Sequence, residues 1–155
     1  MISSRREYLL KHLRGKNHRL AFRAIAELRR LGDGSLASIV SGYKAKDEQR
    51  QFQFFVAQIV IEKGVAGLAK QWSALPSPGW RESLITEIGQ FLDLWMEESL
   101  VDVLIAALND PDETVHGRAV IQLRGLFMER SPIEKWVTRQ RRAQITEALV
   151  IEGCQ

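Results

Sequence analysis

Residues 104–126 read LIAALNDPDETVHGRAVIQLRGL, and this stretch decides the fold that the sequence predicts. Apolar residues at helical spacing end at Leu108, an Asp-Pro-Asp sequence at residues 110–112 predicts a tight turn, and the apolar pattern resumes at Val115. A helix, a turn and a second apolar helix make a helical hairpin. Such a hairpin has more apolar surface than it can bury alone, so it must pack against other helices.

Weaker copies of this hairpin recur upstream at intervals of about 30 residues. Capping or turn residues precede each apolar pattern, and no window shows the alternation and hairpin turns of a β-sheet. Repeats of this kind stack on their neighbours and bury one continuous core, which leaves long walls rather than an enclosed reactive pocket. The expected helix starts lie near Asn17, Asp47, Ser77 and Asp112.

The two ends of the chain are expected to close the stack. Residues 3–14 have the apolar pattern of a short helix, and residues 138–151 have that of a final helix, which we expect to fold back as a cap. The alternative is that the final helix exposes an apolar stripe to another molecule. The predicted core residues are Leu20, Ala24, Leu28, Ile59, Leu84, Ile88, Leu104, Leu108, Ala119 and Leu123.

The acidic turn and the helix after it resemble a HEAT-like repeat. The family pattern has an Asp-Pro-Asp turn, then a Val-Arg pair and an alanine three residues further on, and Asp110, Val115 and Ala119 occupy matching positions. His116 stands where the family has arginine. Arg118 lies about 200° round the helix from that position, so it is not expected to take the place of the arginine.

This resemblance implies an all-α fold, a right-handed α–α superhelix or HEAT-like solenoid of about four hairpins with incomplete repeats at its ends. It implies a single domain over residues 1–155 and a non-enzymatic scaffold that binds other proteins, as most members of such families are. The alternative that the resemblance offers is nucleic-acid binding, as in the HEAT-like alkylpurine DNA glycosylases. A subunit of a phycobilin lyase is a third function known for this architecture.

Length, composition and cysteine content are those of an ordinary globular protein. The chain has 155 residues, of which 45% are hydrophobic and 26% charged, and this suits one domain with a continuous core. Its one cysteine, Cys154, cannot form an internal disulfide. Since the sequence also shows no secretory signal and no apolar run approaching the ~20 residues of a membrane span, we expect a cytoplasmic protein with no membrane partner.

Charge is distributed in three blocks along the chain. Residues 1–31 carry nine Lys or Arg and two acids, residues 82–117 carry nine acids and no Lys or Arg, and residues 118–142 carry seven Lys or Arg and two acids. The net charge of +3 therefore hides blocks of +7, −9 and +5. Charge separated in this way speeds the encounter with a partner and fixes its orientation.

Within the basic blocks, Lys and Arg recur at helical spacing and predict a binding face. Such a face meets an acidic protein, meets the phosphates of a nucleic acid, or stays solvated. Because the central acidic block repels a phosphate backbone, we expect a protein partner, with nucleic acid as the alternative and self-association through end helices or opposite charge blocks as a further option. The predicted partner-binding residues are Lys16, Arg19, Arg23, Arg30, Glu82, Asp93, Lys135, Arg139 and Arg142.

No motif in the sequence predicts catalysis. His12, His18 and His116 lie in different segments, and no Cys, His and acid cluster has metal-ligand spacing. The phosphate-binding patterns GxxxxGKS/T and GxGxxG are absent, as are the hydrolase patterns GxSxG and HExxH. We therefore expect a protein that is not an enzyme and that binds neither cofactor nor metal.

Overall fold

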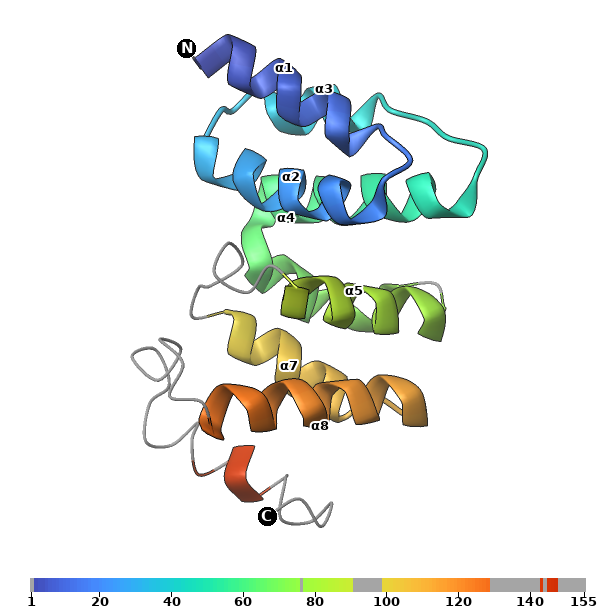
Figure 1. Cartoon of the computed structure of the whole chain (residues 1–155), viewed down its shortest axis with the longest axis vertical. Helices are drawn as coiled ribbons and strands as arrows, with labels where there is room; N and C mark the ends of the chain where they lie inside the picture. The colour runs from blue at the N-terminus through green and yellow to red at the C-terminus, as the bar shows by residue number, and fades with distance from the viewer. Residues whose placement is uncertain (1, 76, 91–98, 129–142, 144, 148–155) are drawn as a thin grey trace. The chain divides into compact units, whose positions relative to one another are not determined.

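The structure is a computed structural model that describes most of the chain, in residues 2–75, 77–90, 99–128, 143 and 145–147. All regular secondary structure in these ranges is helical (Figure 1), which confirms the all-α class for the described residues. They fall into two compact units, one up to Leu68 and the other from Ala69 onward.

Other parts of the predicted architecture are not decided by these observations. The right-handed solenoid of about four hairpins and the single domain stay predictions. Most of the final helix expected over residues 138–151 lies outside the described residues, although residues 145–147 are helical.

The first unit is built from a helical hairpin and two further helices. Its helices are α1 (Ile2–Leu13), α2 (His18–Leu31), α3 (Leu36–Ser41) and, up to Leu68, α4 (Glu48–Lys70). α1 packs against α2 (Figure 1), and Leu10, Leu13 and Ile25 are among the residues buried in this unit. The rings of Phe22 in α2 and Phe52 in α4, whose centroids are 5.3 Å apart, join these two helices.

Local capping signals set the ends of α2. The side chain of Asn17 accepts a hydrogen bond from the Leu20 N–H at 3.1 Å, which confirms Asn17 as the N-cap. Gly32 ends the helix in the left-handed conformation, with φ 65°, and donates its N–H to the Arg29 carbonyl.

The next two helix starts differ from each other in how they are capped. At α4, Asp47 acts as expected, because its carboxylate accepts the Arg50 N–H at 3.0 Å. At α3, Ser35 precedes the helix and is a residue type that often caps helices, but it does not cap this one: its hydroxyl makes no bond to the helix and donates to Asp33 at 2.7 Å. An N-cap residue has an extended backbone and its side-chain oxygen accepts a backbone N–H, whereas the backbone of Ser35 is helical, with φ −81° and ψ −15°.

α4 leaves helical geometry at Gly64. Gly64 has φ 74° and ψ −174°, a combination that is essentially restricted to glycine. By length and hydropathy alone, α4 is the one described helix that is long and apolar enough to cross a membrane. In the window that meets this test, 61% of the residues are buried inside the protein, as in a core helix.

The second unit contains the hairpin predicted from residues 104–126. Its described helices are η1 (Trp72–Ala74), α5 (Pro78–Gln90), α7 (Leu100–Leu108) and α8 (Glu113–Met128). α8 packs against both α5 and α7 (Figure 1). Its buried residues Val115, Ala119 and Leu123 repeat at every fourth position, as an amphipathic helix requires.

His116, which stands at the arginine position of the HEAT-like pattern, and the nearby Arg118 make different contacts. The Nδ1–H of His116 donates to the Leu108 carbonyl at 2.6 Å and so links the two helices of the hairpin. The Nε of Arg118 lies 3.5 Å from a carboxylate oxygen of Glu82 on α5. His116 thus supplies a bond across the hairpin, while Arg118 reaches a different helix.

The helix starts and the core follow the sequence pattern closely. α2, α4, α5 and α8 each begin one residue after an expected start. Nine of the ten predicted core residues are buried. The exception is Leu20, which is half-buried because it lines a pocket at the surface.

The conformation of Gly64 predicts a specific weakness. A β-carbon at this position would lie 2.8 Å from Nη2 of Arg29, and its φ would be strained in any L-residue. Gly64→Ala should therefore lower the free energy of unfolding by about 1–3 kcal/mol, measured by urea denaturation. Gly34→Ala is the control, because a β-carbon there meets nothing within 4 Å, and its effect should stay below about 1 kcal/mol. Equal effects of the two substitutions would contradict the prediction.

Candidate interaction surface on helices α1 and α2

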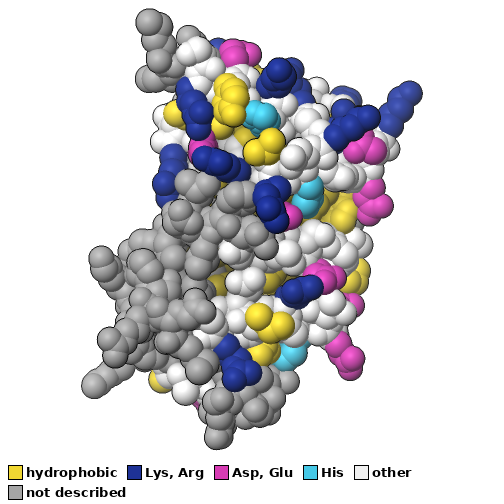
Figure 2. Space-filling model, viewed as in Figure 1, with side chains coloured by type: hydrophobic (Ala, Val, Ile, Leu, Met, Phe, Trp, Pro, Cys, Tyr) yellow, Lys and Arg dark blue, Asp and Glu magenta, His cyan; other side chains and the backbone are white. Residues whose placement is uncertain are grey.

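Three of the predicted binding residues form a stripe of arginines along the exposed face of α2. Arg19, Arg23 and Arg30 are all exposed, and Lys16 is exposed in the turn before the helix. Neither Lys16 nor Arg19 forms an ion pair with any residue in the described ranges. On the face shown in Figure 2, Lys and Arg side chains lie over the region of α1 and α2.

The other predicted binding residues lie either in the second unit or outside the described residues. Glu82 belongs to α5 in the second unit, where it is half-buried and paired with Arg118. The remaining four lie outside the described residues: Asp93, Lys135, Arg139 and Arg142.

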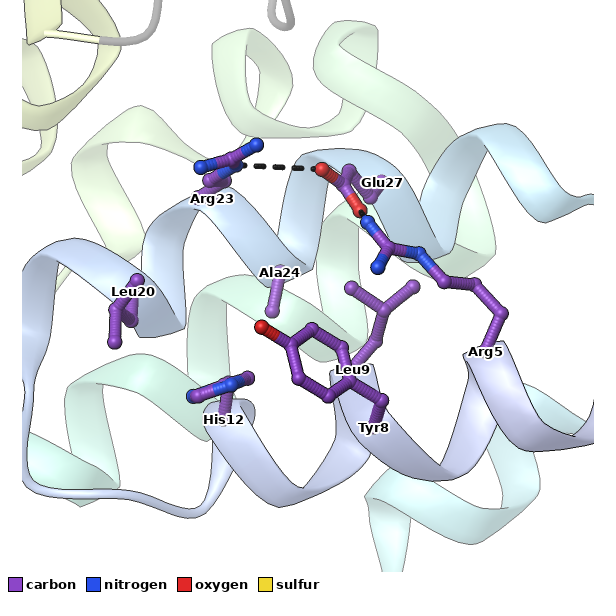
Figure 3. A pocket seen from close by; sticks show the side chains of 8 residues that line it. All are labelled: Arg5, Tyr8, Leu9, His12, Leu20, Arg23, Ala24 and Glu27. Atoms are coloured by element: carbon purple, nitrogen blue, oxygen red, sulfur yellow. Dashed lines mark hydrogen bonds and ion pairs between the residues drawn. The ribbon is translucent and has the colours of Figure 1, made fainter.

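A shallow pocket of about 90 Å³ opens beside the stripe, between α1 and α2 (Figure 3). Leu9 and Ala24 are nearly fully buried and give it an apolar floor. Charged and aromatic side chains surround them. The complete lining is Arg5, Tyr8, Leu9, His12, Leu20, Arg23, Ala24 and Glu27.

Two arginines, one from each helix, share a single carboxylate in this pocket. Nη2 of Arg5 pairs with one carboxylate oxygen of Glu27, and Nε of Arg23 lies 3.3 Å from the other (Figure 3). The Glu27 side chain is 16% exposed, whereas the Arg23 side chain is 54% exposed. The three groups together carry a net charge of +1. Each guanidinium has five N–H donors, so most of them are not used by Glu27.

Tyr8 is an exposed aromatic residue that its neighbours hold in place. Its side chain is 51% exposed. The Arg5 guanidinium lies 5.1 Å from the ring centroid, and the His12 ring packs edge-on at 4.5 Å. Aromatic and arginine side chains are enriched at the centres of protein interfaces, so this pair makes the pocket a candidate contact site.

The contribution of α1 was not predicted from the sequence. Arg5, Tyr8 and His12 are spaced three and four residues apart, which places them on one face of a helix. This spacing is visible in the sequence alone. What the sequence does not show is that this face adjoins Arg23 and Glu27 of α2.

Asp110 is a buried carboxylate in the second unit and is therefore considered as a second candidate, here for a catalytic acid or base. Its side chain is 2% exposed. It accepts hydrogen bonds from the Trp72 indole N–H at 2.8 Å, from Nε of Arg81 at 2.7 Å and from the Asp112 backbone N–H at 2.9 Å. These bonds join η1, α5 and the acidic turn at one point.

The charge state of Asp110 indicates a structural role. Burial raises its pKa, but the hydrogen bonds from Asp112, Trp72 and Arg81 and the charge of Arg81 outweigh burial and hold the pKa below its ordinary value. A general acid or base needs a pKa near the working pH and room for a substrate. Asp110 has neither, because protein groups occupy both of its oxygens.

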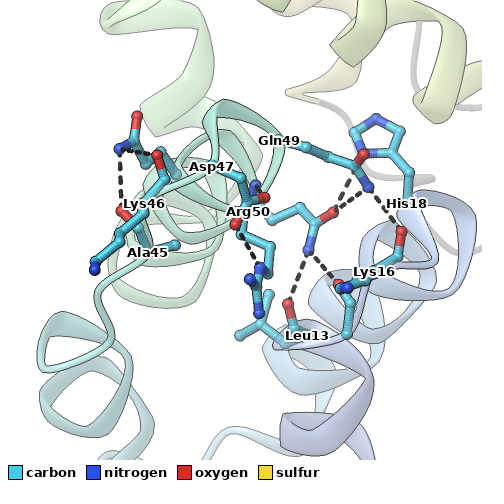
Figure 4. Close-up of polar contacts among 11 residues, drawn as sticks. Leu13, Lys16, His18, Ala45, Lys46, Asp47, Gln49 and Arg50 are labelled. Carbon is cyan, nitrogen blue, oxygen red and sulfur yellow. Dashed lines mark hydrogen bonds and ion pairs between the residues drawn. The ribbon is translucent and has the colours of Figure 1, made fainter.

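Gln53 is the corresponding buried polar residue of the first unit. Its Nε2 donates to the carbonyls of Leu13 and Gly15, at 3.0 and 3.2 Å, and so satisfies the end of α1. Its Oε1 accepts from Gln49 at 3.1 Å and lies 3.4 Å from Nδ1 of His18 (Figure 4). Every polar atom of this side chain is engaged within the protein, which leaves it no role toward a ligand.

Comparisons with protein-family models, with curated proteins and with solved structures find no match to this chain. The HEAT-like assignment therefore stays a prediction. Among the described residues, no group of three or more His, Cys, Asp or Glu side chains is placed to hold a metal ion.

The burial of Asp110 predicts that the ion pair between Asp110 and Arg81 contributes much more to the free energy of unfolding than the pair between Glu82 and Arg118. Asp110→Asn leaves Arg81, whose side chain is 13% exposed, without its counter-ion, and should lower the free energy of unfolding by about 3 kcal/mol. Glu82→Gln breaks the more exposed pair with Arg118 and should cost at most about 1 kcal/mol. Urea denaturation of both variants measures the two values. A cost for Glu82→Gln as large as that for Asp110→Asn would show that burial is not the deciding factor.

The pKa of Asp110 also predicts how this stability depends on pH. Because the pKa is lowered in the folded state, the contribution of the carboxylate is complete above the ordinary value of ~3.9 and is lost as the pH falls through the folded-state pKa. The stability difference between wild type and Asp110→Asn should therefore shrink as the pH is lowered from about 5 to about 2. Urea denaturation across this range tests it, and a constant difference is the contrary result.

Proposed function

We propose that this chain is a non-enzymatic, cytoplasmic protein-binding scaffold of the HEAT-like type, and that α1 and α2 carry its binding surface. The observation that supports this most directly is the arrangement on that surface. Unpaired cations, Lys16 and Arg19 among the described residues, adjoin a pocket with an exposed tyrosine and two arginines. The low cysteine content fits a reducing compartment.

The proposed solenoid rests on the repetition of helical pairs. α1 with α2 and α7 with α8 are packed pairs. Asp112 supports the HEAT-like turn, because its carboxylate accepts the N–H groups of Thr114 and Val115 and so starts α8 as an N-cap. The regular spacing of helix starts, 30, 30 and 35 residues apart, is that of a helical repeat protein.

The use of the acidic residues favours a separate partner over a second copy of this chain. In the described part of the acidic block, Asp110 is buried, Glu82 is paired with Arg118 and Asp112 caps α8, whereas Glu113 is exposed. Three of these four carboxylates are engaged within their own unit. The basic face of α1 and α2 therefore finds its complement in an acidic segment of another protein.

A protein partner also suits the pocket better than nucleic acid does. A nucleic-acid backbone is bound mainly through its phosphate charges, which make no use of apolar surface. In this pocket the buried side chains of Leu9 and Ala24 lie among the charged groups, and the Tyr8 side chain is 51% exposed. The exposed ring and the apolar floor add contact area that a protein segment uses.

Charge reversal on α2 tests the proposed function. A peptide-display selection against the full chain should enrich peptides rich in Asp and Glu. Arg19→Glu, Arg23→Glu and Arg30→Glu, combined in one variant, should bind the enriched peptides at least about tenfold more weakly, since each contact becomes repulsive. The control reverses the exposed residues Lys44, Lys46 and Lys70 and changes the net charge equally.

Two results would overturn the proposal. One is equal loss of peptide binding in the variant and in its control, which would indicate a net-charge effect only. The other is tight, salt-dependent binding to duplex DNA or to RNA with no enrichment of acidic peptides, which would favour the nucleic-acid alternative.

A further inference from the structure

We propose that the pocket between α1 and α2 receives one carboxylate side chain of the acidic partner, and that Glu27 is its built-in competitor. In the free protein Glu27 holds Arg5 and Arg23, and in the complex the partner's carboxylate binds the same two arginines. This inference rests on the proposed protein-binding function and adds to it the chemical group that is recognised and the residue that limits the affinity.

The charge of the pocket calls for one negative charge. Arg5, Arg23 and Glu27 carry +1 together, so a single carboxylate from outside makes the cluster neutral. The two guanidinium groups come from different helices and meet at Glu27 (Figure 3). Each guanidinium commits one nitrogen to Glu27 and keeps further N–H donors for a second acceptor.

The size and lining of the pocket fit the end of an acidic side chain. A volume of about 90 Å³ has room for several water molecules, which is small for a nucleoside and sufficient for a carboxylate with its methylene groups. The methylene groups would lie on Leu9 and Ala24, and half-buried Leu20 flanks them. A nucleic acid would place only its backbone here, against an apolar floor that a phosphate cannot use.

Tyr8 keeps the site in a form that accepts this group. Arg5 lies over its ring and His12 packs against its edge, so the guanidinium is positioned before a partner arrives. A side chain that is already positioned loses less conformational entropy on binding. Neighbouring apolar residues of the partner would then contact the exposed part of the ring.

The test uses two synthetic peptides and the full chain. One peptide repeats glutamate, glycine and leucine, and the other has glutamine in place of each glutamate; both carry a fluorophore, and anisotropy measures binding. The wild type should bind the glutamate peptide and not the glutamine peptide. Arg5→Gln and Arg23→Gln should each weaken binding by about fivefold to tenfold. Glu27→Gln frees both arginines and should strengthen binding by about the same factor.

Matched controls come from exposed residues of α8. Arg124→Gln removes the same charge as the two arginine variants, and Glu113→Gln removes the same charge as Glu27→Gln. Both controls should leave the affinity for the glutamate peptide unchanged. Circular dichroism establishes that all variants keep their helical content.

The outcomes separate this inference from the proposed function. If the glutamate peptide binds and the α2 charge reversal weakens it, but Glu27→Gln leaves the affinity unchanged or lowers it, the competitor role is overturned and the protein-binding function stands. If Glu113→Gln strengthens binding as much as Glu27→Gln, the effect is one of net charge and the pocket assignment fails. If the wild type binds duplex DNA or RNA but neither peptide, both proposals fail.

Discussion

The structure depends on one constraint, which is that its helices are apolar on more than one side. α8 illustrates it, because this helix buries residues against both α5 and α7. α4 illustrates it more strongly, because Phe52 and Phe54, which lie about 200° apart round the helix, are both buried. Burial of one such side chain contributes roughly 1.5–3 kcal/mol, so helices with two apolar sides are stable only with neighbours on both. Pairing into hairpins, and packing of each hairpin on a further helix, follows from this requirement.

The polar residues that enter these cores act as fixed points between the elements. Asp110 ties η1, α5 and the acidic turn together, and Gln53 ties α4 to the end of α1. Each satisfies several partners at once, which is the condition under which a buried polar group is tolerated. Some carboxylates of the acidic block, residues 82–117, are therefore used for contacts inside the folded chain and are not available at its surface. Lys16 and Arg19 of the first basic block have no such use among the described residues.

Much of the fold was readable from the sequence, and the reason is local. Helix starts are encoded by capping residues such as Asn17 and Asp47, whose side chains bond to the backbone three residues on. Core positions follow from helical periodicity, as at Ile88 and Leu104. Ser35 shows the limit of this local signal, because it stands before α3 but its backbone is helical and its hydroxyl makes no bond to the helix.

The candidate site was only half predictable, because it is a property of two helices. Arg23 was found from its spacing along α2, whereas Arg5 and Tyr8 belong to α1 and gain meaning only from the contact between the helices. Periodicity gives the face of each helix but not the register in which two faces meet. Glu27 is the clearest case, since its importance lies in being shared by Arg5 and Arg23. The buried role of Asp110 was likewise hidden, because Trp72 and Arg81 are distant from it in sequence.

The break at Gly64 has a consequence for the dynamics of α4. Helical cooperativity passes along consecutive residues that share the same backbone geometry, and Gly64 leaves that geometry while the residues on both sides keep it. Transient opening that begins in the short segment after Gly64 therefore stops there instead of spreading into the long segment before it. In amide hydrogen exchange, this 23-residue helix would behave as two independent pieces, with the division lying inside a continuous ribbon rather than at a loop.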